Sequence, residues 1–177
     1  MDIKAFIFDM DGLLFDSERI VQRSWEIAGD ELGIPHMGDV IYHTLGMNRA
    51  GRNEYFRKYI REDFPFEEFG KLTRDNFWKI VDKEGLPLKK GAKELLAYGK
   101  SQGYKMAVAT SSSREYAMGN LIRAGIDSYF DSVVCGDMVK KAKPDPEIYQ
   151  KACESLGIQP EYCMAFEDAP GGILSAH

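Results

Sequence analysis

Four short apolar runs stand out along the chain, and each is bounded by turn or helix signals. Their nearly continuous hydrophobicity is typical of parallel strands that are covered by helices on both faces. The runs are Ala5 to Phe8, Met106 to Ala109, Val133 to Cys135 and Cys163 to Phe166. The pattern therefore predicts an α/β fold with a doubly wound parallel sheet.

The segments that separate the later runs carry helix signals. Ser112 and Glu115 have the spacing of a capping box, in which each side chain bonds a backbone amide at the start of a helix. Asp145 can cap the next helix, and Gly157 is placed to end it. We therefore expect strand and helix to alternate from about Lys105 onward.

A different pattern fills the stretch from Ser17 to about Gly85. It has helical periodicity followed by aromatic-rich segments, and no convincing strand interrupts it. Its first apolar positions are Ile20, Trp25, Ile27, Ala28 and Leu32. We expect a helical cap domain at residues 17–85, inserted into a catalytic α/β core made of residues 1–16 and 86–177.

The composition narrows the possible partners. With 44% hydrophobic and 29% charged residues, the 177-residue chain resembles an ordinary globular protein. No apolar run approaches the roughly 20 residues of a membrane helix, and the first residues lack the layout of a signal peptide. The net charge of −5 argues against a nucleic-acid binder. We expect a cytoplasmic protein without membrane partners, whose anionic ligand is small.

The three cysteines, Cys135, Cys153 and Cys163, are odd in number and lie singly in apolar or helical stretches. This favours structural thiols in a reducing compartment over a disulfide framework, zinc binding or redox chemistry.

Two carboxylates, Asp9 and Asp11, follow the first run in the sequence Phe8-Asp9-Met10-Asp11-Gly12. Open α/β sheets bind ligands at this edge. Two acids so close repel unless a cation lies between them or one of them is protonated. The alternative is a turn signal at Asp11-Gly12 with a surface acid before it.

A hydroxyl cluster and a lysine follow the second and third runs. Thr110 and Ser111 open a Ser/Thr cluster whose hydroxyls and amides could bind an anion, although such clusters are usually helix caps. Lys143 precedes Pro144, which keeps it out of a helix and near the sheet edge. The alternative interpretation of Lys143 is a solvated side chain in a lysine-rich segment.

The fourth run ends in a second acidic pair, Glu167 and Asp168. Oxygen ligands gathered at one sheet edge suit Mg²⁺ far better than a softer metal. The alternative for this pair is capping of the helix that begins near Pro170.

All four signals fall at strand ends and in one order. In that order, Asp9-Met10-Asp11-Gly12, Thr110, Lys143-Pro144 and Glu167-Asp168 resemble the four motifs of the haloacid-dehalogenase-like hydrolase superfamily. Because a helical insertion directly follows the first motif, the chain is most similar to the β-phosphoglucomutase-like phosphatase branch. The resemblance covers essentially the whole chain, and it implies a Rossmann-like core with an inserted helical cap.

The resemblance also implies catalytic roles. Asp9 matches a nucleophile that forms an aspartyl-phosphate, and Asp11 matches the general acid and base. Thr110 and the Ser111 amide would bind phosphoryl oxygens, while Lys143 would offset negative charge. Phosphoryl transfer depends mainly on positioning and charge neutralisation, which this set of residues can supply.

Mg²⁺ is the cofactor that the resemblance implies. Its ligands would be Asp9, the Asp11 carbonyl and Asp168, with Glu167 either a further ligand or a partner of the ligands. The implied activity is a Mg²⁺-dependent phosphatase acting on a small phosphorylated metabolite, in the first place a sugar phosphate.

Two cap positions bear on the reaction. Val21 occupies the position of a histidine that assists the general acid in the mutase of this branch, so hydrolysis is favoured over a phosphosugar mutase, which stays the alternative. Arg49, in Gly46-Met47-Asn48-Arg49, matches an arginine that holds the far end of the substrate, or it is a solvated helix charge.

The sequence stops at Leu174-Ser175-Ala176-His177, inside the helix expected after the fourth motif. The family usually adds at least one more strand, so a truncated, non-catalytic chain that keeps the fold is a further alternative. In the family the fourth-motif strand lies beside the first. Without a later strand, residues 162–166 would form an exposed edge, through which we expect self-association unless something covers it.

Overall fold

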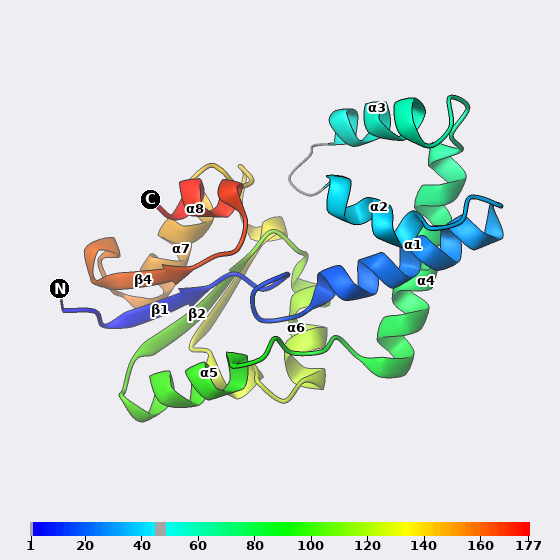
Figure 1. Ribbon diagram of the computed structural model, residues 1–177. Helices are drawn as coiled ribbons and strands as arrows, with labels where there is room; N and C mark the ends of the chain where they lie inside the picture. Colours follow the sequence, from blue (N-terminus) through cyan, green and yellow to red (C-terminus); the bar gives the residue numbers. More distant parts are fainter. Residues whose placement is uncertain (1, 45–48) are drawn as a thin grey trace. The chain divides into compact units, whose positions relative to one another are not determined.

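The computed structural model describes residues 2–44 and 49–177, except for the side chain of Arg49. It divides the chain into two compact units, one made of Met1–Asp16 and Leu86–His177 and the other of Ser17–Gly85. The first unit is built on a parallel sheet with helices, and the second consists of helices (Figure 1). The predicted α/β class is confirmed.

The sheet has four parallel strands in the order β3-β2-β1-β4. Their bounds are β1 (Ala5–Phe8), β2 (Lys105–Thr110), β3 (Ser132–Cys135) and β4 (Cys163–Phe166). Phe8 at the end of β1 is level with Val108 on one side and with Phe166 on the other. The strand of the fourth motif therefore lies beside that of the first, as expected, and the carboxyl ends of all four strands meet at one edge.

Strand β1 is buried on both faces, which explains its continuous hydrophobicity. Phe8 stacks on Phe166 of the neighbouring strand, with ring centroids 4.8 Å apart. On the opposite face, Ile7 packs into a cluster with Ile148 and Ala152. Because successive strand residues point to opposite faces, an apolar side chain is needed at every position.

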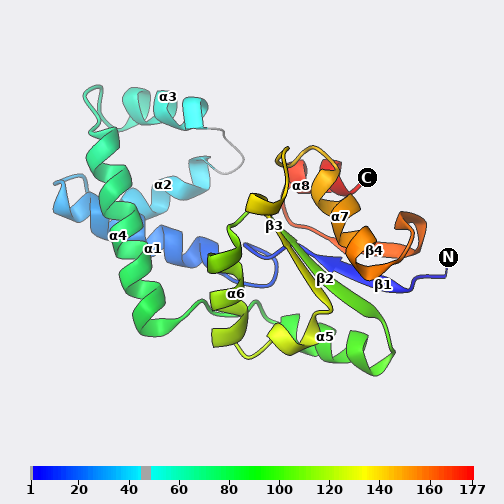
Figure 2. The same cartoon turned by 180° about the vertical axis from the view of Figure 1, so that it is seen from behind.

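Helices cover the two faces of the sheet. They are α5 (Ala92–Ser101), α6 (Arg114–Arg123), α7 (Glu147–Leu156) and α8 (Pro170–Ala176), with short 3-10 turns at Asp127–Tyr129, Gly136–Met138 and Pro160–Tyr162. Helices α5 and α6 lie on one face of the sheet, and α7, which leads the chain back from β3 to β4, lies on the other (Figures 1 and 2). This is the arrangement that right-handed crossovers are expected to produce. Helix α5 has no counterpart among the helices predicted from sequence.

Two predicted helix starts differ in outcome. At α7, the Asp145 carboxylate accepts a hydrogen bond from the Glu147 N–H at 3.1 Å, as predicted, and Gly157 ends the helix in the left-handed region with φ 68°. At α6, the prediction was wrong by one residue. Ser113, and not Ser112, is the cap, and its hydroxyl accepts from the Tyr116 N–H at 3.4 Å.

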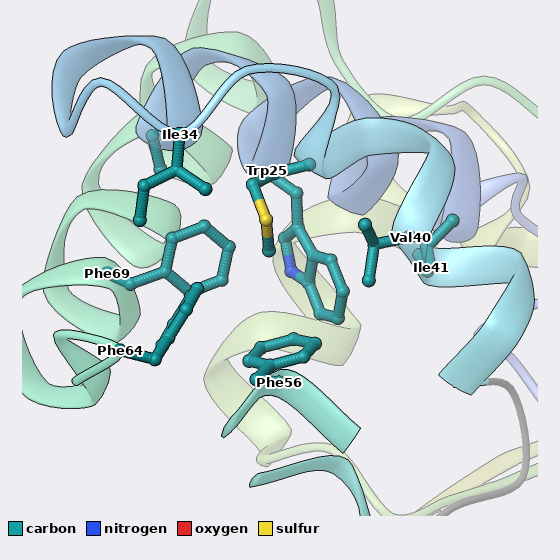
Figure 3. Packing of buried hydrophobic residues seen from close by; sticks show 9 residues of the cluster. Trp25, Ile34, Val40, Ile41, Phe56, Phe64 and Phe69 are labelled. Carbon is teal, nitrogen blue, oxygen red and sulfur yellow. The ribbon is translucent and has the colours of Figure 1, made fainter. Parts of the chain in front are cut away.

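The second unit contains α1 (Ser17–Glu31), α2 (Met37–Thr44), α3 (Arg49–Tyr59) and α4 (Phe66–Glu84). Its core is aromatic (Figure 3): the Trp25 ring makes edge-to-face contacts with Phe56 and Phe69, at 5.5 and 5.6 Å between centroids. Ile27, which the periodicity assigned to the same apolar face, is 39% exposed. No strand interrupts the described part of this unit.

The chain leaves and re-enters the α/β unit at neighbouring points. The Asp16 N–H donates to the Pro87 carbonyl at 2.8 Å, and the Lys89 N–H donates to the Leu14 carbonyl at 2.9 Å. The Lys89 ammonium also lies 3.3 Å from the Asp16 carboxylate. The two connecting segments are thus held together by main-chain and ionic contacts.

Strand β4 is an edge of this sheet, and Met164 on it is 43% exposed. The structure contains one chain, so self-association through this edge stays a prediction.

None of the helices in the described part of the chain has both the length and the apolar character that a membrane span requires. The three cysteines are free thiols in this structure, and Cys135 and Cys153 are buried.

Candidate active site

Asp9 is held at the centre of the sheet edge. Its N–H donates to the Phe166 carbonyl at 3.0 Å, which fixes the backbone between β1 and β4. Its carboxylate is buried, and Oδ1 accepts a hydrogen bond from Lys143 Nζ at 2.6 Å. Lys143 Nζ also donates to Glu167 Oε1 and, at 3.0 Å, to the Ala109 carbonyl. One ammonium group therefore joins the ends of three strands.

Lys143 differs from its neighbours in the lysine-rich segment. Lys140 and Lys141 are exposed, whereas the Lys143 side chain is only 10% exposed. A buried ammonium is stable only when it is paired and hydrogen-bonded. The two carboxylates satisfy this requirement, so the alternative of a solvated side chain does not describe Lys143.

Both carboxylate oxygens of Glu167 are occupied. Oε1 accepts from Lys143 and from the Tyr149 hydroxyl, the latter at 2.9 Å, and Oε2 accepts from the N–H groups of Asp168 and Ala169 at 3.1 and 3.2 Å. Burial, and then the charge of Glu167, raises the pKa of Tyr149, so this phenol stays protonated and acts as a donor. Glu167 is thereby fixed in a single orientation.

Burial dominates the electrostatics of Asp9. It raises the pKa of this carboxyl from 3.8 to about 7, while the charge and hydrogen bond of Lys143 oppose the rise. The nearby carboxylates of Glu167 and Asp168 contribute smaller parts of the same rise. The site therefore holds more negative charge than its lysine neutralises.

Asp9, Glu167 and Asp168 can each bring one carboxylate oxygen within 4.8 Å of the other two. Three carboxylates with one ammonium leave a formal charge of −2, which matches a divalent cation, and oxygen ligands of this kind suit Mg²⁺. Gly12 makes room for the arrangement. It has φ +84°, and a Cβ on it would lie 2.1 Å from Asp168 Oδ2. The donor set fits a hard divalent metal ion.

The carboxylate of Asp11 lies outside that three-carboxylate group of the described chain. Its Oδ2 accepts from the Ser112 hydroxyl at 2.8 Å, and its Oδ1 accepts from the Tyr116 hydroxyl at 3.1 Å. Asp11 and Gly12 do lie in a turn, but both neighbours of β1 are parallel, so this turn does not connect two strands of the sheet.

The hydroxyl cluster after β2 divides into several environments. Thr110 is 1% exposed, and its Oγ1 accepts from the Ser112 N–H at 3.1 Å. Ser111 is exposed, and its carbonyl lies against Gly136, where an added Cβ would be 2.2 Å away.

Arg49 is the first residue of α3, but its side chain and residues 45–48 lie outside the described part of the chain.

Sequence reasoning did not find three hydroxyl groups of the site. Ser112 was interpreted as a helix cap, and Tyr116 and Tyr149 carried no signal that separated them from ordinary helix residues. The one signal that could have pointed to these tyrosines is their spacing from the residues after the strand ends. Tyr116 lies one helical turn after Ser112, and Tyr149 lies on the first turns of the helix that follows Lys143.

Comparison with known proteins identifies the class to which this fold and site belong. The chain matches the haloacid dehalogenase-like hydrolase family over residues 3–177, and it belongs to that family. The resemblance inferred from the four motifs is thus confirmed.

Relatives within the family carry phosphatase names. The chain is 33% identical to the phosphorylated carbohydrates phosphatase of Thermotoga maritima, over 98% of this chain and 80% of that protein. It is 31% identical to hexitol phosphatase A of Escherichia coli, over 99% and 79%. A crystal structure of a candidate β-phosphoglucomutase from Thermotoga maritima superposes with a TM-score of 0.80 at 32% identity, covering 98% of this chain and 80% of that one.

Proposed function

We propose that this hydrolase is a Mg²⁺-dependent phosphatase of small phosphorylated metabolites, in the first place sugar phosphates, and that it works through an aspartyl-phosphate on Asp9. The observation that carries the proposal is the buried Lys143 ammonium shared by Asp9 and Glu167 at the carboxyl edge of the sheet. Such a site lowers the repulsion between an attacking carboxylate and a phosphate, which is the main obstacle to this reaction.

In the first step Asp9 attacks phosphorus. Because Oδ1 is bonded to Lys143, we assign the attack to Oδ2. A bond forms between this oxygen and phosphorus while the ester P–O bond breaks, and Asp11, which enters this step as the carboxylic acid, gives its proton to the departing oxygen. Thr110 and the Ser111 amide are the proposed ligands of the phosphoryl oxygens.

In the second step water attacks the aspartyl-phosphate. Asp11, now a carboxylate, accepts the proton of this water, the bond between Asp9 and phosphorus breaks, and inorganic phosphate leaves. Asp9 and Asp11 return to their starting protonation states, so the net reaction is hydrolysis of a phosphate ester.

Asp9, Asp168 and the Asp11 carbonyl are the proposed Mg²⁺ ligands. Glu167 fits better as a partner that fixes Lys143, because hydrogen bonds already occupy both of its oxygens. When bound, the cation would supply positive charge that keeps Asp9 ionised and offsets the charge of the phosphoryl group.

Hydrolysis is favoured over mutase chemistry. Val21, at the position expected to hold the assisting histidine of a mutase, is an apolar residue packed against the core of the helical unit. It cannot donate or accept a proton. We further propose that the helical unit excludes water from the site during turnover, and that Arg49 contacts the far end of the substrate.

The test is phosphate release from p-nitrophenyl phosphate and from a panel of sugar phosphates, with Mg²⁺ and with EDTA. We expect turnover only with the metal, and kcat reduced by many powers of ten in Asp9→Asn. Calorimetric Mg²⁺ binding gives a readout that does not depend on turnover, and Asp168→Asn should weaken it.

A well-folded, metal-loaded chain that hydrolyses none of these esters would contradict the phosphatase assignment. More than trace steady-state activity in pure Asp9→Asn would contradict the assignment of the nucleophile. Conversion of one phosphosugar isomer into another, without phosphate release, would favour the mutase alternative.

A further inference from the structure

The carboxylate of Asp11 is held by two hydroxyl groups from one short segment. Ser112 lies in the turn after β2, and Tyr116 lies on the first turn of α6. Each hydroxyl donates to a different oxygen of Asp11, at 2.8 Å from Ser112 and 3.1 Å from Tyr116. A carboxylate held through both oxygens has little freedom to rotate about its side-chain bonds.

Neither hydroxyl has a part in the phosphatase mechanism set out above. Tyr116 is half-buried, and burial followed by the charge of Asp11 raises its pKa, so the phenol stays protonated and donates. The Ser112 N–H is tied in turn to Thr110 Oγ1 at 3.1 Å. We call the two hydrogen bonds from Ser112 and Tyr116 to Asp11 the clamp. Its residues closely follow Thr110, the proposed phosphoryl-binding hydroxyl at the end of β2.

Resting on the proposed phosphatase function, we infer that Tyr116, with Ser112, is a positioning residue that aims the Asp11 carboxyl at the leaving-group oxygen. An in-line displacement puts the leaving oxygen on the far side of phosphorus from Asp9. A general acid must then be anchored away from the nucleophile and its carboxylate neighbours. The bonds from Ser112 and Tyr116 anchor Asp11 in that way, outside the group formed by Asp9, Glu167 and Asp168.

The clamp has a distinctive kinetic consequence. A sugar alkoxide is a poor leaving group and needs the proton from Asp11, whereas p-nitrophenolate leaves without one. Loss of the clamp should therefore slow the first step for sugar phosphates much more than for p-nitrophenyl phosphate. The parameter to compare is kcat/KM, because it reports on steps up to the first irreversible one.

The experiment compares Tyr116→Phe with wild type on one sugar phosphate and on p-nitrophenyl phosphate. We expect kcat/KM for the sugar phosphate to fall about 10- to 100-fold, and for p-nitrophenyl phosphate less than about 3-fold. Ser112→Ala should shift the same ratio, and Ser112→Thr, which keeps a hydroxyl, should largely preserve it. Tyr98→Phe is the matched control, because Tyr98 is a 53% exposed tyrosine on α5.

A double-mutant cycle separates positioning from a merely structural role. If Tyr116 acts through Asp11, adding Tyr116→Phe to Asp11→Asn should change kcat/KM little further, whereas a structural defect would lower it equally in both backgrounds. Crystals of the Ser112→Ala, Tyr116→Phe double variant give a readout without turnover. The Asp11 carboxylate should have left the position it occupies beside α6.

The failures of the two proposals are distinguishable. A wild-type chain without turnover contradicts the proposed function. An active wild type whose Tyr116→Phe variant loses equal activity on both substrates, or none, contradicts only the clamp. An unmoved Asp11 carboxylate in the double variant also overturns the clamp.

Discussion

At the scale of single residues, the site holds negative charge where the fold does not favour it. Asp9 is buried, two further carboxylates lie near it, and Lys143 is the ammonium bonded to it. A buried carboxylate charge that is not fully neutralised lowers the folding stability, because burial favours the neutral form of an acid. Function and stability are therefore opposed at Asp9.

We predict that Asp9→Asn stabilises the metal-free protein in a pH-dependent way. Between pH 3.8, the ordinary pKa, and about 7, the raised pKa, the folded chain retains a proton that the unfolded chain has released. Stability conferred by the protonated acid is thus lost as pH rises through this range, whereas asparagine does not titrate. The gain should approach zero below pH 4 and reach up to about 4 kcal/mol at pH 8.

Urea unfolding in EDTA at pH 4.5 and pH 8 measures this difference. Asp63→Asn is the control, because the side chain of Asp63 is 82% exposed and its removal should change stability by less than about 1 kcal/mol at either pH. A gain for Asp9→Asn that is the same at both pH values would contradict the burial argument.

At the scale of elements, α8 shows how two adjacent glycines can have different functions. A Cβ on Gly172 would lie 1.9 Å from the Glu167 carboxylate, whereas a Cβ on Gly171 would meet nothing within 4 Å. Gly172 is the place where the backbone of α8 approaches the carboxylate that holds Lys143. Its missing side chain is part of the site.

The pair Gly171→Ala and Gly172→Ala tests this point. Alanine normally stabilises a helix by up to about 1 kcal/mol relative to glycine, and Gly171→Ala should follow that rule. Gly172→Ala should instead cost about 1–3 kcal/mol and lower kcat, because Glu167 must shift. Thermal unfolding and phosphatase assays on both variants check this, and equal behaviour of the two would exclude a specific role for Gly172.

The elements also show what sequence could predict. Strands β1 and β4 begin and end where their apolar runs do. In β1 the unbroken hydrophobic pattern reflects burial on both faces, whereas β4 has the same pattern although Met164 and Ala165 are exposed. Helix α5 was missed. Its cap, Gly91, has φ 88° and no side chain to bond an amide, so the usual start signal is absent.

The contacts of the site were less predictable than its strands. The motif residues follow strand ends, so topology alone brings them to one edge. Tyr116 bonds a residue 105 positions earlier in the chain, and nothing local in the sequence encodes such a pairing. The cap of α6 was misplaced for a related reason, since the Ser112 hydroxyl is bonded to Asp11 instead. Long-range bonds of this kind override local propensity.

At the scale of the whole molecule, each unit has a core of its own. The helical unit packs around Trp25 and Phe56, and the α/β unit around Ile7 and Ile148. Separate cores and neighbouring connections are the conditions under which an inserted domain folds independently. The insertion is therefore expected to be separable from its host.

We predict that joining Asp16 to Leu86 through a short Gly-Ser linker yields a folded α/β unit. It should unfold cooperatively in urea and retain slow hydrolysis of p-nitrophenyl phosphate with Mg²⁺, while losing preference among sugar phosphates. Ser17–Gly85 produced alone should be helical by circular dichroism. Absence of a cooperative transition in both pieces would show that the two cores depend on each other.

The paired connections have a consequence for the inserted segment. The two chain segments that lead to it are bonded from Asp16 to Pro87 and from Leu14 to Lys89. All four bonded residues belong to the α/β unit, so the exit and the re-entry of the chain are fixed side by side within that unit. The two ends of the inserted segment, Ser17–Gly85, therefore start from neighbouring points, and an insertion of another length could be accommodated there without disturbing the sheet.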